Sequence, residues 1–181
     1  MRIKSEDSLL LIIDIQEKLF PHISNNKILL ENVIKLIKGI KILKLPILIT
    51  EQYTKGLGFT LDEIKQELDL EYKPFEKMAF SCCKEDIFFQ KLKDLNKKNI
   101  VICGIETHVC VLQTCIDLLE NGFNPIIVED CVSSRKENDK KIAINRMNNE
   151  GSLITTYESI LLELCVKSGT DIFKSISKII K

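Results

Sequence analysis

The segment from residue 99 to residue 122 constrains the fold most strongly, because its hydrophobic period changes in the middle. Residues 100–103 form a short, wholly apolar run, typical of a strand that helices cover on both faces. Gly104 is expected to end this strand, and Gly122 is placed to cap a following helix. From Val109 on, the apolar residues recur at helical spacing, at Leu112, Cys115, Ile116 and Leu119. The segment therefore predicts a strand, a tight turn and a helix.

Cys110 lies in the first turn of this predicted helix. Free backbone N–H groups and the helix dipole favour a thiolate there, and the thiolate is the reactive form of cysteine. Cys110 is therefore a candidate nucleophile. Two alternatives stay open. A cysteine is often only a small core residue, and His108 could activate Cys110, although residues two apart in one helical turn point in different directions.

The rest of the chain alternates between strand and helix patterns. Strands are predicted at residues 9–13, 47–49, 125–128 and 153–156, with a short edge piece near Glu76 and Lys77. Helices are predicted at about residues 27–44, 61–68, 84–95, 138–149, 157–164 and 171–180. Since parallel strands need crossover helices, this order predicts a three-layer α/β (αβα) sandwich around a mostly parallel six-stranded sheet.

Composition limits the possible partners. With 181 residues and 45% hydrophobic composition, we expect one compact domain over residues 1–181. Lys plus Arg and Asp plus Glu both total 26, so nothing in the charge favours nucleic acid or an anionic membrane. The first apolar run is too short for a signal peptide, which predicts a cytoplasmic protein. The seven cysteines form no pair of CxxC motifs, so we expect reduced thiols and no metal or other cofactor.

Polar candidates follow the predicted strands at their carboxyl ends, where parallel sheets bind ligands. They are Asp14, the loop from Glu51, Lys77, Cys110, and Asp130 with Ser133. Attack by Cys110 on a carbonyl carbon would need a base, and Asp14 is the predicted one. Lys77 would compensate the buried negative charge, and the backbone N–H groups of Glu106 and Cys110 would stabilise the oxyanion. Simpler explanations remain, since aspartates often cap turns and lysines usually lie on the surface.

Five segments resemble the isochorismatase-like cysteine hydrolase superfamily, most closely its isochorismatase domain-containing branch. They are DIQEKLF at 14–20, TEQYTKGLG at 50–58, FEKMAFS at 75–81, GIETHVCVLQT at 104–114 and VEDCVSSR at 128–135. The resemblance covers nearly the whole chain in order. It implies a Rossmann-like sheet with helices on both faces and a catalytic triad of Asp14, Lys77 and Cys110. It also implies a non-proline cis peptide bond before Glu106.

The resemblance also narrows the chemistry. Nicotinamidases of the superfamily bind a metal through an aspartate and histidines after the second strand, whereas this chain has no histidine between His22 and His108. Isochorismatases that cleave a vinyl ether lack the cysteine nucleophile. Retention of Cys110 therefore favours hydrolysis of a C–N bond in a small amide or related carbonyl compound, through a thioester.

The identity of the substrate is not encoded in any of these motifs. Pocket-lining side chains are predicted to be Gln16, Phe20, Gln52, Tyr53 and His108, although each could serve loop packing instead. The superfamily resemblance and the apolar C-terminal helices predict a homo-oligomer, a dimer or tetramer. Two other functions stay open: a non-catalytic binding or scaffold protein that retains the fold, and a redox sensor in which Cys110 pairs with a second thiol.

Overall fold

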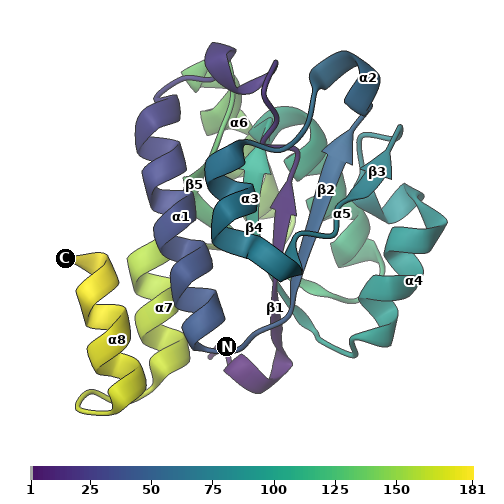
Figure 1. Ribbon diagram of the computed structural model, residues 1–181. Coiled ribbons are helices and arrows are strands. Elements are labelled where there is room, and N and C mark those ends of the chain that lie inside the picture. Colours follow the sequence, from purple (N-terminus) through teal and green to yellow (C-terminus); the bar gives the residue numbers. More distant parts are fainter. Residues whose placement is uncertain (1) are drawn as a thin grey trace.

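The structure, a computed structural model, describes residues 2–181 and contains one central sheet between two layers of helices (Figure 1). All neighbouring strands are parallel, in the order β3-β2-β1-β4-β5-β6. The strands are β1 (Ser8–Ile13), β2 (Ile47–Gln52), β3 (Phe75–Lys77), β4 (Asn99–Ile105), β5 (Asn124–Ser133) and β6 (Leu153–Thr155). The predicted α/β sandwich is confirmed, and β3 is an edge strand as expected.

The helices divide between the two faces of the sheet, each with its own hydrophobic cluster. One face is covered by α1 (Asn26–Ile42), α3 (Asp62–Leu68), α7 (Tyr157–Cys165) and α8 (Asp171–Ile180). The other face is covered by α4 (Asp86–Asp94), α5 (Leu112–Glu120) and α6 (Glu137–Asn149). A four-residue helix that the sequence did not predict, α2 (Thr54–Leu57), follows β2. Within the described residues, no helix has the length and apolar character needed to cross a membrane.

Strand β1 shows why its sequence is apolar at every position. Leu10 and Ile12 join the cluster under α1, whereas Leu9, Leu11 and Ile13 join the cluster under α4 and α5. All five side chains are fully buried, because successive residues of a strand point to opposite faces and helices cover both.

Gly104 has a different role from the one predicted. It does not end the strand, because β4 continues to Ile105 and Gly104 pairs with Ile13 of β1. Its φ is 140°, and a Cβ atom at this position would lie 2.2 Å from the carbonyl oxygen of Ile13. Glycine is therefore required here because two central strands approach closely, and this contact carries β4 up to the turn that holds Cys110.

Strand β5 is also longer than predicted. Its pairing with β4 shifts register, from Ile102 opposite Ile127 to Gly104 opposite Val132. This irregularity is of the bulge type and absorbs extra residues, so that the strand continues beyond the polar pair Glu129 and Asp130. The strand predicted at residues 125–128 was therefore too short, because the bulge lets β5 continue past these two polar residues to Ser133.

Helix α5 starts with a wide turn, Thr107–Val111, of the π type. The N–H of Leu112 donates to the carbonyl of Thr107, five residues earlier. A π turn contains one residue more than an α turn, and this changes which later residues face the core. The core contains Cys115 and Leu118, whereas Leu112 and Ile116, which we had predicted to share one helix face with Cys115, are only half-buried. The predicted cap at Gly122 is confirmed, with a φ of 75° and its N–H donated to Leu119.

Candidate active site

The carboxyl ends of the central strands bring Asp14 and Lys77 into direct contact. Asp14 follows β1, Lys77 ends β3, and Oδ2 of Asp14 lies 2.7 Å from Nζ of Lys77. Both side chains are buried, with 1% exposure each. Cys110, from the turn after β4, is close enough to the same carboxylate for each group to shift the pKa of the other. Three segments that are far apart in sequence therefore place an acid, an amine and a thiol together.

Lys77 is surrounded by acceptors. Besides the Asp14 carboxylate, its Nζ donates to Oε1 of Gln52 at 2.6 Å and to the carbonyl oxygens of Phe80 at 3.0 Å and Ala79 at 3.2 Å. Burial is the largest single effect and lowers the pKa of Lys77, but Asp14, Cys82 and Cys110 together oppose it, and the pKa is raised overall. Lys77 is therefore held as a protonated, fully hydrogen-bonded ammonium group.

Asp14 has the environment expected of a base. Burial raises the pKa of its carboxyl group, and Lys77, Cys110 and Thr50 partly oppose this shift. The hydroxyl of Thr50 donates to Oδ1 at 2.8 Å. A carboxylate with a raised pKa accepts a proton more readily than an exposed one, so the site can take a proton at the Asp14 oxygens.

Cys110 is 7% exposed, and its thiol differs from the sequence-based expectation. Burial, followed by the nearby charge of Asp14, raises the pKa of the Cys110 thiol, whereas the helix N-terminus had been expected to favour the thiolate. Burial dominates because Cys110 belongs to the hydrophobic cluster under α4 and α5. At neutral pH the resting group is the thiol, so attack on a carbonyl requires transfer of its proton to a neighbouring base.

The turn before Cys110 contains the predicted oxyanion donors. A cis peptide bond joins Ile105 to Glu106, and the Glu106 carbonyl accepts the N–H groups of Val109 and Val111 at 3.0 and 3.3 Å. The Glu106 carboxylate is buried and accepts the backbone N–H of Arg135 at 2.9 Å and its Nε at 3.1 Å. Sequence reasoning gave Arg135 no role. The only available signal was its place at the end of the VEDCVSSR segment.

Gln16 and Gln52 are committed to internal hydrogen bonds. Nε2 of Gln16 donates to the carbonyl oxygens of Gln52 and Gly58, and its Oε1 accepts the N–H of Gln52 at 2.7 Å. Gln52 in turn donates its own Nε2 to the carbonyl of Met78 at 2.8 Å and accepts from Lys77. These amides tie the ends of β1, β2 and β3 together and orient Lys77. Their predicted place in the lining of a ligand pocket stays a prediction.

The other predicted pocket residues lie in three different places. Phe20 packs against the hydrophobic cluster under α1, and Tyr53 is largely exposed, with its ring beside Gly56. Nδ1 of His108 lies 3.0 Å from the hydroxyl of Ser134, and its Nε2 lies 3.9 Å from Oδ2 of Asp139. Both ring nitrogens therefore face groups other than the thiol of Cys110, which leaves the Cys/His alternative without support.

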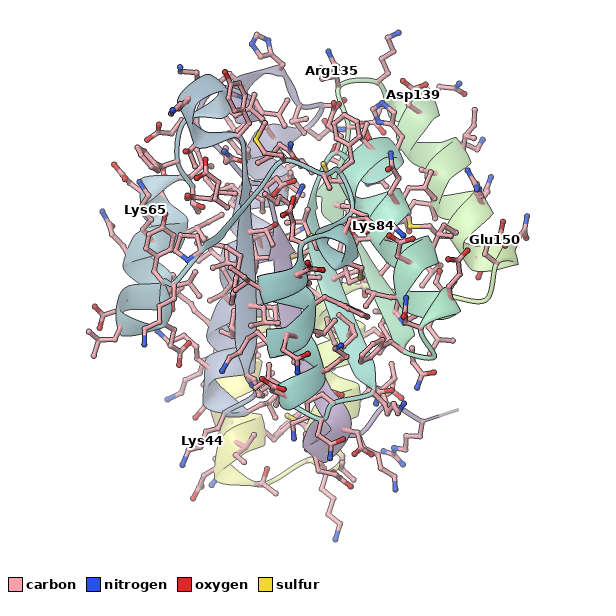
Figure 2. All side chains as sticks on the ribbon, turned by 90° about the vertical axis from the view of Figure 1, so that its right-hand side faces the viewer. Lys44, Lys65, Lys84, Arg135, Asp139 and Glu150 are labelled. Atoms are coloured by element: carbon pink, nitrogen blue, oxygen red, sulfur yellow. The ribbon has the colours of Figure 1, made fainter. Side chains whose placement is uncertain are left out.

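Asp130 and Ser133, the remaining candidates at this edge, hold the backbone in place. Oδ1 of Asp130 accepts the N–H of Tyr157 at the start of α7, and the hydroxyl of Ser133 donates to the carbonyl of Ser24. Arg135 and Asp139 lie at the top of Figure 2, at the edge where the strands end. This edge therefore contains structural polar groups as well as the three clustered side chains.

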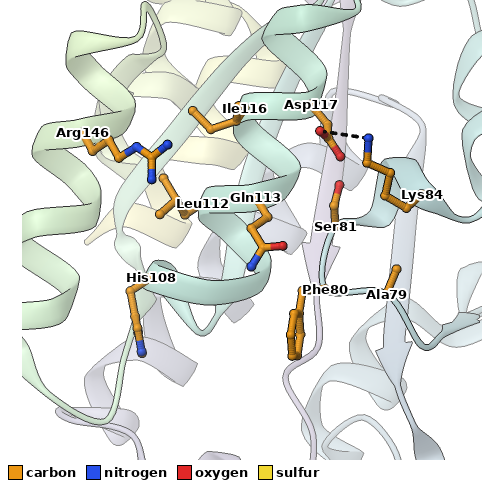
Figure 3. Close-up of a pocket in the computed structure, with 10 residues that line it drawn as sticks. All are labelled: Ala79, Phe80, Ser81, Lys84, His108, Leu112, Gln113, Ile116, Asp117 and Arg146. Atoms are coloured by element: carbon orange, nitrogen blue, oxygen red, sulfur yellow. Dashed lines mark ion pairs between the residues drawn. The ribbon is translucent and has the colours of Figure 1, made fainter.

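A cavity of about 400 Å³ adjoins this cluster (Figure 3). Its lining residues are Ala79, Phe80, Ser81, Lys84, His108, Leu112, Gln113, Ile116, Asp117 and Arg146. Ala79 and Phe80 are the residues whose carbonyls bind Lys77, which places the cavity next to the site. Leu112 and Ile116, which the π turn leaves out of the core, supply apolar surface. Of the predicted pocket residues, His108 is the one in this lining.

Comparison with known proteins identifies the family. Residues 8–159 match the family model described as Isochorismatase domain. The chain belongs to the isochorismatase family. Isochorismatase family protein 1B of Dictyostelium discoideum is 42% identical over 185 residues, an alignment that covers 99% of this chain and 89% of the relative. Membership confirms the resemblance found in the motifs and supports a hydrolase-type function for this isochorismatase-family chain.

Solved structures agree with this assignment. The MAR1 ribonuclease of Caenorhabditis elegans has a TM-score of 0.93 at 39% identity, covering 99% of this chain and 92% of that protein. The YcaC gene product of Escherichia coli, described as an octameric hydrolase of unknown specificity, also has a TM-score of 0.93 and covers 99% of this chain and 89% of that one. Its identity is 23%, so this second likeness is one of fold alone.

Proposed function

We propose that this isochorismatase-family protein is a cysteine hydrolase that cleaves the C–N bond of a small amide or a related carbonyl compound. The observation that carries the proposal is the buried contact between Asp14 and Lys77, with the Cys110 thiol against the same carboxylate. Nucleophile, base and fixed positive charge are the groups that acyl transfer through a thioester requires.

In the first half of the proposed reaction, Sγ of Cys110 attacks the carbonyl carbon while the thiol proton moves to the Asp14 carboxylate. The carbonyl oxygen becomes an oxyanion, for which the backbone N–H groups of Glu106 and Cys110 are the proposed donors. The C–N bond then breaks, Asp14 returns the proton to the leaving nitrogen, and an amine or ammonia departs. The product of this half is a thioester on Cys110.

In the second half, water attacks the thioester carbon and gives one proton to Asp14. Collapse of this second tetrahedral intermediate breaks the C–S bond, and Asp14 returns the proton to Sγ. A carboxylic acid leaves, and the thiol is restored. Because Lys77 has four acceptors around Nζ, its part is to keep Asp14 ionised and oriented and not to carry a proton.

Thiol labelling separates this proposal from a non-catalytic scaffold. Cys83 and Cys165 are more exposed than Cys110, so exposure alone predicts that limiting iodoacetamide labels these two first. If Asp14 activates Cys110, mass spectrometry should instead find Cys110 labelled first, with the preference lost in Asp14→Asn. Labelling that follows exposure in both proteins would contradict the proposal.

Turnover of an amide panel completes this test. With an activated substrate, rapid acid quenching should trap an acyl adduct on Cys110, and Cys110→Ala should show neither adduct nor turnover. Cys115→Ala, which removes a buried thiol from the core side of α5, serves as the matched control.

Because one relative is named a ribonuclease, single-stranded RNA belongs in the panel of substrates. With equal numbers of acidic and basic residues, we expect no cleavage of it.

We further propose that the protein forms a dimer or tetramer through its C-terminal helices. Ile176 of α8 is buried against the chain's own core, but Val166 and Ile172 remain 57% and 45% exposed on the same hairpin. Val166 directly follows α7 and Ile172 lies in the first turn of α8, and exposed apolar side chains such as these are typical of subunit contacts. Light scattering should therefore give a multiple of the 20.8 kDa chain mass, falling to one chain in Ile172→Asp. An unchanged mass in that variant would locate the interface elsewhere.

A further inference from the structure

A buried hydroxyl group lies directly behind the carboxylate of Asp14. Thr50, on β2, is fully buried, and its Oγ1 donates to Oδ1 of Asp14 at 2.8 Å. On its other side, the same oxygen accepts from Sγ of Cys82 at 3.8 Å. Cys82 is itself fully buried, and its backbone N–H is held by the hydroxyl of Thr114 at 3.0 Å. A thiol, a hydroxyl and a carboxylate therefore form a short chain of hydrogen bonds.

The direction of this chain follows from the hydrogens available. A threonine hydroxyl has one hydrogen to donate and two lone pairs that accept. Burial raises the pKa of Cys82 to about 11, so its sulfur carries a hydrogen and donates to Thr50. The single hydrogen of Thr50 then points to Oδ1 of Asp14. The other oxygen, Oδ2, lies 2.7 Å from Nζ of Lys77, so both carboxylate oxygens are held and the orientation of the Asp14 side chain is fixed.

We infer that Thr50 is a positioning residue for the proposed hydrolysis, because its hydroxyl donates to Oδ1 of Asp14 and so holds the carboxylate that takes the proton of Cys110 in one orientation. Cys82 acts through Thr50 by fixing the direction of the hydroxyl. The inference rests on the proposed function and adds two residues, neither of which touches the substrate. It also gives a role to the second thiol near the site, which the proposed reaction does not use.

Loss of the Thr50 hydroxyl should change the pH below which the reactivity of Cys110 falls, which is the acidic limb of its pH profile. The groups around the Asp14 carboxylate are Lys77 from β3, Cys110 from the turn after β4, Thr50 from β2 and Cys82 from the 3-10 turn Cys82–Lys84. Of these, Lys77, Cys110 and Thr50 lower the pKa of Asp14 against the effect of burial. Removal of the Thr50 hydroxyl leaves Oδ1 buried without its donor, so the pKa of Asp14 rises. As the pH falls, Asp14 is then protonated, and can no longer act as a base, at a higher pH than in the wild type.

The test is the pH dependence of Cys110 alkylation by iodoacetamide, followed by mass spectrometry between about pH 4 and 9. Thr50→Val keeps the shape of the side chain and removes the hydroxyl. We expect its acidic limb to move up by about one pH unit, the size expected for loss of one hydrogen bond to a carboxylate. Thr50→Ser restores the hydroxyl and should return the limb to the wild-type position. Thermal unfolding of each variant is measured in parallel.

A second variant keeps the inference testable if Thr50→Val does not fold. Cys82→Ala leaves Thr50 in place but frees its hydroxyl to rotate, so a smaller shift in the same direction is expected. If the acidic limb of Cys110 alkylation lies at the wild-type pH in every folded variant, Thr50 and Cys82 have only a packing role. That result would overturn the inference, even if thermal stability changed. The variant Asp14→Asn distinguishes failure of the proposed function from failure of the role proposed for Thr50. If it leaves the wild-type limb unchanged, the proposed function itself fails and this inference with it.

Discussion

Gly104→Ala is expected to prevent the chain from folding. The new Cβ would lie 2.2 Å from the carbonyl oxygen, 2.7 Å from the nitrogen and 2.8 Å from the Cα of Ile13, and all three are backbone atoms of a paired strand. The φ of 140° adds strain that an L side chain does not accept. A loss of more than about 4 kcal/mol is expected, which is in the range where marginal proteins unfold. Soluble yield, circular dichroism and urea unfolding measure it.

Gly122→Ala is the matched control for this prediction. Gly122 also has a positive φ, 75°, but apart from its own chain neighbours no atom of residues 2–181 lies within 4 Å of the place that the new methyl group would take. Its cost is therefore limited to the left-handed conformation, about 1–2 kcal/mol. Similar losses of stability in the two variants would show that conformation matters at Gly104 and that the contact with β1 does not.

Asp14→Asn should destabilise the fold as well as abolish hydrolysis. It leaves the ammonium of Lys77 buried without its negative partner, and breaking a buried ion pair from one side costs about 3–5 kcal/mol. The double variant Asp14→Asn with Lys77→Met removes both charges and should recover most of this loss while remaining inactive. Urea unfolding of the wild type, both single variants and the double variant provides the complete cycle.

Glu150→Gln provides a control on an exposed pair. Glu150 lies 3.8 Å from Arg146, both side chains are more than half exposed, and such pairs contribute about 1 kcal/mol or less. The loss of unfolding free energy in Glu150→Gln should therefore be small.

If the Asp14 and Lys77 variants had additive costs, with no recovery in the double variant, the two charges would not be coupled as their 2.7 Å contact indicates.

The features predicted correctly from sequence are those that local pattern determines. The wholly apolar residues of β1 identify a strand covered on both faces, and α8 begins and ends where its periodicity indicated. The convergence of Asp14 and Lys77 followed from one rule, namely that parallel strands end at the same edge.

The features missed from sequence depend on tertiary contacts. The role of Gly104 depends on the distance between two backbones, which no single segment encodes. The hydrogen bonds of Gln16 join residues 36 or more positions apart, so its amide was assigned to a ligand instead of to the backbone. The thiol of Cys110 was expected to ionise because a helix start is visible in sequence, whereas the burial that opposes ionisation is not.

Burial raises the pKa of all seven cysteine thiols, and this has a consequence for oxidative damage. Peroxides attack thiolates, and a sulfur that keeps its hydrogen is converted to sulfenic acid only slowly. For the six thiols that are not the proposed nucleophile, we therefore expect slower oxidation by peroxide than for a thiol with an unshifted pKa.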